Sequence, residues 1–384
     1  MQRSYFKFIV YCFCLMIMAP VQSGCYQDDN STYIGSTAQI EGDEYTNQAE
    51  AREDITFILG EDREADNPYY QEASNYYLFN PKGRTEHLVN SCRTLLDVGN
   101  YLRSHKPANG LPWGTVHLVS HGNQWNGLST KVTPHSKRST ADEIEKFLTA
   151  KAIEPVSDDI LDEASEIFIH GCGVGNNEEL VERIKQALAV NCSVKARASK
   201  LYEYYTSEQY AHQVKSTHRY LAHAWSISYK YGAQPEQDCI INELASKYPQ
   251  AQLNWSEVLE REAPRFAGDS YHYTFEVPVK WVIPFPSKSA MPDVSDQEKQ
   301  LAWIKTQPEI LAKLQTLNLP LEKFSWKFRK VYTKDEEGTR TPALWVKGYC
   351  TILSVIQPLV EEGDNNKPLL PDLNDDQFYY STSI

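Results

Sequence analysis

The stretches HLVSHGN (residues 117–123) and EIFIHGCGVGNNEEL (residues 166–180) decide the expected fold. Each is an apolar run that stops at a reactive side chain beside glycine, His121 in the first and Cys172 in the second. Short apolar runs of this kind predict buried strands, and in an open α/β sheet functional groups gather beyond the carboxyl ends of the strands. His121 and Cys172, 51 residues apart, are therefore expected on one rim of a parallel sheet.

Strand and helix patterns alternate on both sides of these two stretches. Apolar runs predict strands within 54–62, 114–122, 165–173 and 193–206, and three-to-four spacing predicts helices within 86–106, 140–150 and 176–190. Thr140 with Glu143, and Asn176, are the expected helix caps. This alternation predicts the α/β class, with a mostly parallel sheet covered by helices on both faces.

Composition along the chain divides it into five expected segments. They are a signal peptide (1–24), a polar and acidic disordered tether (25–53), an α/β domain (54–235), a β-richer α+β part (236–362) and a polar tail (363–384). The part at 236–362 is expected to pack on the first sheet or to extend it. Its long aromatic strand patterns are the basis of this expectation.

The amino terminus has the features of an export signal. Arg3 and Lys7 precede an apolar stretch at 8–18 that is too short to span a bilayer. The residues before Cys25 resemble a bacterial lipobox, although Gln22 stands where that pattern prefers Leu. The resemblance implies an exported protein held at the bacterial outer membrane or cell surface by a lipid on Cys25, with simple cleavage as the alternative.

Charge and cysteine content limit the possible partners. A net charge of −13 with a pI near 5.3 argues against nucleic acid as a partner, because no basic region is present to neutralise phosphates. Five cysteines follow Cys25, and the odd number leaves at least one thiol unpaired. Cys172 is our candidate, while the other four could form two disulfides: Cys92, Cys192, Cys239 and Cys350. No CxxC pair occurs, so we do not expect a structural zinc cluster. His121, His170 and Cys172 could be drawn as metal ligands, but no fourth ligand is evident, so we expect no metal site and no cofactor.

The physical chemistry of these positions favours Cys172 as a nucleophile. A helix that begins near Asn176 would direct its positive amino-terminal end towards the sulfur and favour the thiolate. His121 could accept the thiol proton and later donate it to a leaving amine. The main-chain N–H groups of Gly122 and Cys172 are the candidate oxyanion hole.

These motifs resemble a known enzyme family. The stretches VHLVSHG and IFIHGCG are similar to the strand–His–Gly and strand–Cys–Gly motifs of the caspase-like cysteine peptidases, which include caspases, gingipains, clostripain and separase. The resemblance covers about 54–210 and implies a caspase-like sheet, His121 as general base and acid, Cys172 as nucleophile and a protein or peptide substrate. The chain departs from the family at His170-Gly171, where the family usually has Ala or another small residue before the cysteine, often with Gln or Asp ahead of it.

Residues that contact substrate are harder to identify. Asp62 and Arg63 follow the first strand, Trp125 lies in the loop after His121, and His170 ends the strand before Cys172. Solvated loop charges, plain packing and a core histidine are the respective alternatives for these positions.

Three functions agree with the sequence. The first is a cell-envelope cysteine endopeptidase that acts through an acyl-enzyme on Cys172. The second is another cysteine hydrolase that takes its base from His212, His218 or His223, and the third is a non-catalytic surface or adhesion lipoprotein with a caspase-like fold.

Overall fold

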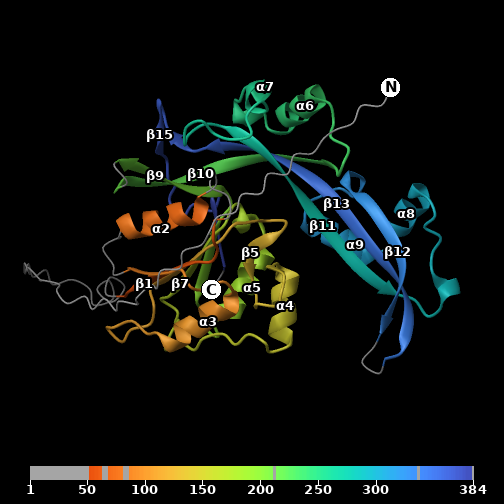
Figure 1. Ribbon diagram of the computed structural model, residues 1–384, viewed down its shortest axis with the longest axis horizontal. Helices are drawn as coiled ribbons and strands as arrows, with labels where there is room; N and C mark the ends of the chain where they lie inside the picture. The colour runs from red at the N-terminus through yellow and green to blue at the C-terminus, as the bar shows by residue number, and fades with distance from the viewer. Residues whose placement is uncertain (1–51, 63–67, 81–85, 211–212, 335–337, 383–384) are drawn as a thin grey trace, which may run out of the picture. The chain divides into compact units, whose positions relative to one another are not determined.

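The computed structural model describes residues 52–62, 68–80, 86–210, 213–334 and 338–382. Within them the chain has a mixed α/β structure, with a six-stranded, mostly parallel sheet and a long antiparallel sheet towards the C-terminus (Figure 1). The prediction of an α/β fold with a mostly parallel sheet is confirmed. The predicted signal peptide, Cys25 and nearly all of the tether lie outside the described residues.

The six-stranded sheet has the strand order β16-β8-β7-β3-β1-β2. Its strands are β1 (Asp54–Ile58), β2 (Glu86–Val89), β3 (Thr115–Val119), β7 (Glu166–His170), β8 (Lys195–Ser199) and β16 (Tyr379–Ser381). All neighbours are parallel except β16, which runs antiparallel to β8. The chain passes from β2 at one edge back across β1 to β3, so the order reverses between β1 and β3. This is the position where open α/β sheets form a crevice.

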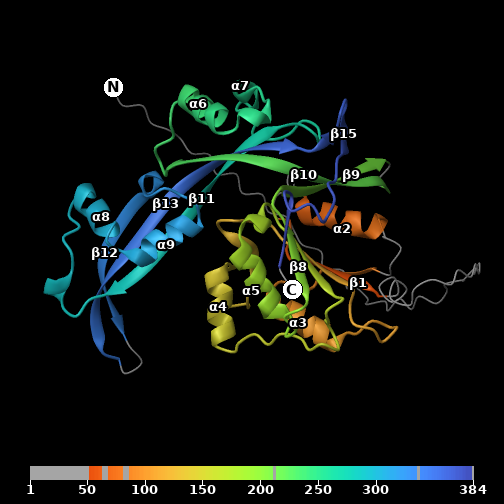
Figure 2. The same cartoon turned by 180° about the vertical axis from the view of Figure 1, so that it is seen from behind.

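The two faces of this sheet are covered differently. Helices α3 (Leu95–Ser104), α4 (Ala141–Thr149) and α5 (Glu178–Leu188) lie on one face, where their apolar side chains form one continuous core with the strands. The other face carries α2 (Tyr69–Phe79) and the strands β9 (Tyr202–Tyr210) and β10 (Gln213–Lys230) (Figures 1 and 2). Helices were expected on both faces. On the second face α2 meets this expectation, whereas the other covering elements, β9 and β10, are strands.

The predicted single helix at 86–106 is wrong. Residues Glu86–Val89 form the edge strand β2, and α3 begins only at Leu95. The Thr94 side chain accepts a hydrogen bond from the Asp97 N–H and so caps the helix. The apolar pair Leu88 and Val89 satisfied the helical spacing by chance, since a four-residue strand is too short to show its own period.

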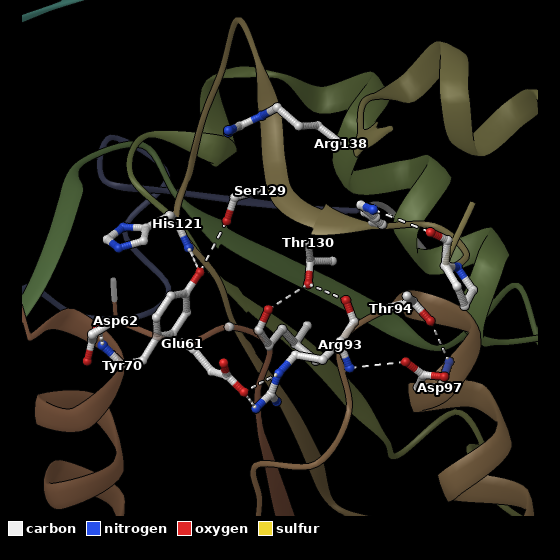
Figure 3. Close-up of a pocket in the computed structure, with 14 residues that line it drawn as sticks. Glu61, Asp62, Tyr70, Arg93, Thr94, Asp97, His121, Ser129, Thr130 and Arg138 are labelled. Carbon is white, nitrogen blue, oxygen red and sulfur yellow. Dashed lines mark hydrogen bonds and ion pairs between the residues drawn. The ribbon is translucent and has the colours of Figure 1, made fainter. Parts of the chain in front are cut away.

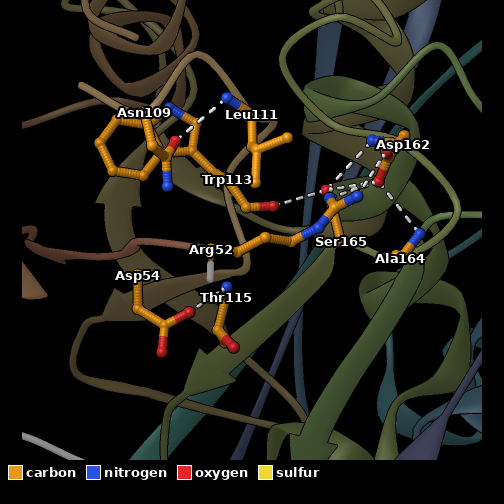
Figure 4. A network of polar contacts seen from close by, with 9 residues as sticks. All are labelled: Arg52, Asp54, Asn109, Leu111, Trp113, Thr115, Asp162, Ala164 and Ser165. Atoms are coloured by element: carbon orange, nitrogen blue, oxygen red, sulfur yellow. Dashed lines mark hydrogen bonds and ion pairs between the residues drawn. The ribbon is translucent and has the colours of Figure 1, made fainter. Parts of the chain in front are cut away.

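Ionic contacts secure the amino-terminal end of the sheet, opposite His121 and Cys172. Both guanidinium nitrogens Nη1 and Nη2 of Arg52 donate to the Asp162 carboxylate at 2.7 and 2.9 Å (Figure 4). The Thr115 N–H donates to Asp54 at 2.6 Å and ties β3 to β1. Charge-assisted and bidentate hydrogen bonds are strong, so this rim holds the strands in register.

The antiparallel sheet has the order β11-β13-β10-β9, and β12 also pairs with β13. Its further strands are β11 (Tyr271–Pro284), β12 (Ser325–Lys334) and β13 (Arg340–Pro358). Helices α8 (Gln297–Ile304) and α9 (Pro308–Thr316) pack on one face, while α6 (Gln237–Lys247) and α7 (Trp255–Val258) cover part of the other. The remaining elements are β4 (Gly122–Asn123), β5 (Gly127–Lys131), β6 (Arg138–Ser139), β14 (Val360–Glu361), β15 (Asp364–Pro368) and short 3-10 turns at Val174–Asn176, Pro249–Ala251, Lys288–Ala290 and Leu321–Lys323.

The structure differs from the expected segments at two boundaries. Strands β9 and β10 lie within the expected α/β domain at 54–235, yet they pair into the antiparallel sheet. Strand β16 lies in the expected polar tail at 363–384, yet it returns to the edge of the parallel sheet. No helix in the described part of the chain is long and apolar enough to cross a membrane.

Candidate active site

His121 and Cys172 follow neighbouring strands at matching positions. Strands β3 and β7 are parallel with Val119 opposite His170, and the Ser120 N–H donates to the His170 carbonyl at 3.0 Å. Each reactive residue lies two positions beyond its strand's last paired residue. The register therefore brings His121 and Cys172 to the same rim, although no hydrogen bond joins their side chains among the described residues.

Tyr69 is a neighbour of both. Its ring stacks on the His121 ring with centroids 4.3 Å apart and planes inclined by 27°. Burial raises the pKa of Tyr69 well above its usual value, and the negative charge of an ionised Cys172 raises it further. The Tyr69 hydroxyl is buried and has no hydrogen-bond partner among the described residues. One tyrosine at the start of α2 thus links the imidazole to the surroundings of the sulfur.

Tyr70 fixes the main chain at His121. Its hydroxyl accepts a hydrogen bond from the His121 N–H and lies 3.1 Å from Ser129 Oγ (Figure 3). The His121 carbonyl in turn accepts from the Ser129 N–H at 2.6 Å. The residue is therefore held by β5 and α2 at the point where β3 ends.

The His121 imidazole is suited to accept a proton. Burial lowers its pKa from the usual 6.5, the Asp62 carboxylate opposes this effect, and the Arg138 guanidinium adds to it. The ring is therefore neutral near pH 7, and a neutral imidazole has a free nitrogen lone pair.

Cys172 is partly exposed, and its sulfur is turned towards β9 in this conformation. It donates to the Glu203 carbonyl at 3.4 Å, and the residue packs against a cluster of the antiparallel sheet to which Tyr202, Tyr204, Tyr271 and Tyr273 also belong. Burial, followed by the charge of Glu203, raises the pKa of the thiol to about 11, although main-chain hydrogen bonds lower it in part. The sulfur is consequently a thiol at neutral pH, so the helix after it does not produce a resting thiolate.

That helix begins later than expected. A 3-10 turn occupies Val174–Asn176, and α5 begins at Glu178 with Asn177 as its cap, since the Asn177 side chain accepts from the Leu180 N–H at 3.0 Å. The expected cap, Asn176, instead donates to the Lys200 carbonyl. Thr140 caps α4 as predicted, accepting from the Glu143 N–H at 3.2 Å.

The two expected oxyanion donors, the Gly122 N–H and the Cys172 N–H, have different surroundings. Residues 121 and 129 are hydrogen-bonded across β4 and β5, so the next pair, Gly122 and Leu128, is of the non-bonded kind, and the Gly122 N–H points away from β5. The Cys172 N–H has no main-chain or side-chain oxygen acceptor among the described residues. Both groups therefore remain candidates to receive an oxyanion.

His170 does not face a substrate. Its side chain is fully buried, with Nδ1 2.7 Å from Glu203 Oε1 and Nε2 2.9 Å from both Tyr77 Oη and His117 Nδ1. Burial alone would raise the pKa of Glu203, but the charges of His170 and Arg219 hold it at about 2. The prediction of His170 as a substrate contact is corrected, because it belongs to an ionic network beneath the site.

A cavity of about 740 Å³ opens beside His121 at the reversal point between β1 and β3. Residues of both signs line it, including Glu61, Asp62, Arg93, Asp97 and Arg138 (Figure 3). Asp62 accepts from the N–H groups of Tyr70 and Gln71 and so starts α2. Asp62 thus lines the cavity as expected, while Arg63 lies outside the described residues.

Trp125 contacts the C-terminal part of the chain. Its indole N–H donates to the Leu317 carbonyl at 3.0 Å, and its ring lies 5.5 Å from that of Phe275. It also lines two further cavities of about 400 and 550 Å³. Packing therefore accounts for the position of the Trp125 side chain, which also borders these two cavities.

The alternative bases and the cysteines have definite positions. His223 stacks on Trp225 and His218 lies near Tyr220, while His212 lies outside the described residues. Neither described ring contacts Cys172. The five cysteines after Cys25 are all free, with Cys192 and Cys239 exposed.

The sequence did not single out Tyr69 or Glu203. Tyr69 lies in the aromatic stretch at 67–77, whose sequence allows a cleft wall but more often indicates packing under a loop, and a single glutamate in a strand pattern carries no signal of its contacts. No family model, curated protein or solved structure matches the chain. Among the described residues, no group of three or more His, Cys, Asp or Glu is placed to hold a metal ion.

Proposed function

We propose that the protein is a caspase-like cysteine endopeptidase of the bacterial cell envelope, with Cys172 as nucleophile and His121 as general base and acid. The observation that carries the proposal is the β3–β7 register, which places the two residues at equivalent positions beyond adjacent parallel strands. The mostly parallel six-stranded sheet agrees with the architecture that the sequence resemblance implies.

The protonation states suggest attack by a thiol, with no preformed ion pair. The Cys172 sulfur would attack the scissile carbonyl carbon while its proton passes to the neutral His121 imidazole. A C–S bond forms and the carbonyl electron pair becomes an oxyanion, which the Gly122 and Cys172 N–H groups would receive. Collapse breaks the C–N bond, His121 protonates the leaving amine, and water then hydrolyses the thioester to free the thiol.

This step requires the sulfur to leave its resting position. The thiol now donates to the Glu203 carbonyl, and Cys172 packs against the tyrosine-rich cluster of the antiparallel sheet. Rotation about the Cys172 side chain towards His121 would expose it to a carbonyl at the rim. The substrate side chain next to the cut bond would then occupy the cavity lined by Asp62 and Arg138.

The direct test is covalent labelling of the full chain with peptidyl acyloxymethyl ketones that carry Asp, Asn, Arg, Lys or a small residue. We expect one adduct, mapped to Cys172, that His121→Ala reduces strongly and Cys172→Ala abolishes. The exposed pair Cys192→Ala and His135→Ala are matched controls that should label as the native chain does. A folded protein that gives no adduct with any probe rules out the peptidase.

The packing of Cys172 favours a second candidate, a non-catalytic surface lipoprotein with this fold. A free cysteine that packs against apolar and aromatic side chains, as Cys172 does, is usually a packing residue. For this candidate, binding to cell-surface material is unchanged in Cys172→Ala and no ketone reacts. If Cys172→Ala loses that binding and the ketones label Cys172 in the native chain, the peptidase is favoured.

Export and a lipid anchor on Cys25 complete the proposal. A diacylated cysteine would partition the protein into a detergent phase, since stable anchoring needs more than one acyl chain. Cys25→Ser should shift the protein to the aqueous phase, and an unchanged partition of this variant excludes the anchor.

A further inference from the structure

Three lysines form a row across the antiparallel sheet. Lys347 of β13 is opposite Lys280 of β11 on one side and Lys327 of β12 on the other. Directly paired residues of neighbouring strands point to the same face, with Cα atoms about 4.5–5.5 Å apart. The three ammonium groups therefore share one face of the sheet.

That face is open where the row lies. The neighbours Val279 and Val346 point the opposite way, into the core under α8 and α9. Lys280 and Lys327 are exposed, and Lys347 is partly exposed. Among the described residues, no carboxylate oxygen lies within ion-pair distance of these three side chains.

Like charges directly opposite each other destabilise a sheet. The structure relieves this only in part. Lys347 lies 4.2 Å and Lys327 5.4 Å from the Tyr349 ring centroid, while Lys280 lies 6.0 Å from that of Trp345. A further cation, Arg329, is opposite Trp345 in the adjacent row. Concentrated positive charge on a chain with a net charge of −13 requires a physical reason.

The arrangement fits one kind of partner. Protein–protein interfaces use uncovered aromatic anchors and contain little lysine, whereas here the two aromatic rings are already covered by ammonium groups. The row is one residue wide along the strands, since Pro278, Tyr349 and Ser325 flank it on one side. A line of point charges suits a linear polyanion better than a plane of lipid headgroups.

We propose that Lys280, Lys347 and Lys327, with Arg329, bind an anionic polysaccharide that carries closely spaced sulfate or phosphate groups. The polymer lies across the three strands, and its charges replace the missing carboxylates. This binding is independent of the proposed peptidase chemistry.

The test uses the full chain with dextran sulfate and with neutral dextran as probes. We expect salt-sensitive binding to dextran sulfate only, because exposed ion pairs are screened. The triple variant K280Q/K327Q/K347Q should lose at least about tenfold in affinity. The control K137Q/K151Q/K305Q removes three exposed lysines elsewhere and should stay within about twofold.

A second readout separates binding from folding. Removing the like-charge row should leave the melting temperature unchanged or higher, since repulsion is relieved. Equal affinity of both triple variants for dextran sulfate overturns the proposal, as does tighter binding to vesicles that contain anionic lipid than to the polymer. Labelling of Cys172 by peptidyl ketones is unchanged in the lysine variant, so failure here leaves the peptidase proposal intact.

Discussion

Alkylation of Cys172 by a small reagent tests the state of its sulfur. Burial and the nearby Glu203 charge raise the pKa of this thiol from 9.0 to about 11. Only the thiolate reacts, and each unit of pKa lowers its fraction tenfold, so the reactive fraction near neutral pH falls about 100-fold. The packing of Cys172 against the tyrosine-rich cluster of the antiparallel sheet restricts access to the sulfur and adds to this effect.

The assay is timed exposure to iodoacetamide followed by peptide mapping. Cys192 and Cys239 are exposed and free, so they serve as references within the same chain. We expect Cys172 to react about 100-fold more slowly than these references near neutral pH. Its rate should rise about tenfold per pH unit up to about pH 10.

Cys92 and Cys350 are buried thiols that provide controls with a similarly raised pKa. Burial raises the pKa of each of these thiols to about 11. If Cys172 reacts as fast as Cys192, the sulfur is either exposed or already ionised, and the reasoning about a resting thiol is wrong. A peptidyl ketone that labels Cys172 but not Cys92 would show that bound substrate, with His121, activates the thiol.

Three further changes have defined outcomes. Tyr69→Ala removes the stacked support of His121 and should slow ketone labelling, whereas Tyr69→Phe keeps the ring and should retain most of it. Glu203→Gln leaves buried positive charge without its partner, so urea unfolding should show a loss of ~3–5 kcal/mol. The pKa of Glu203 is held at about 2, below its value of about 4.3 in unfolded chains. The stabilisation by ionised Glu203 is therefore complete above about pH 4.3 and is lost as the pH falls towards 2. Urea midpoints measured in acid would report this loss. Gly175→Ala would place a methyl group 2.5 Å from the Ala198 carbonyl oxygen, so it should lower the free energy of unfolding by ~1–3 kcal/mol. An unchanged melting temperature would show that the backbone shifts to accept the methyl group.

The central strands were predictable because each is short, apolar and followed by a turn signal. Strands β1, β3 and β7 lie inside the predicted ranges, and the cap at Thr140 follows from local hydrogen bonding alone. The edge strand β2 was not predicted, since its four residues were absorbed into a helical pattern. For the aromatic and turn-rich stretch at 67–85 the sequence predicts a loop with a short helix, whereas the structure has the 11-residue helix α2 there.

The site could be predicted only in outline. The rim position of His121 and Cys172 follows from strand ends, which are local features. The stacking of Tyr69 on His121 and the packing of Cys172 against the cluster of β9 and β11 depend on segments about 100 residues away in the sequence or less. His170 shows the same limit, since its partner Glu203 lies on a strand of the other sheet.

The sequence by itself determined the α/β class, the order of the central elements and the position of His121 and Cys172 just beyond β3 and β7, because periodicity and turn chemistry are encoded in neighbouring residues. Only the tertiary structure decided the protonation of Cys172, the burial of His170 and the lysine row. Each depends on which side chains meet across strands distant in sequence. Burial and charge act through those contacts, and no local pattern records them.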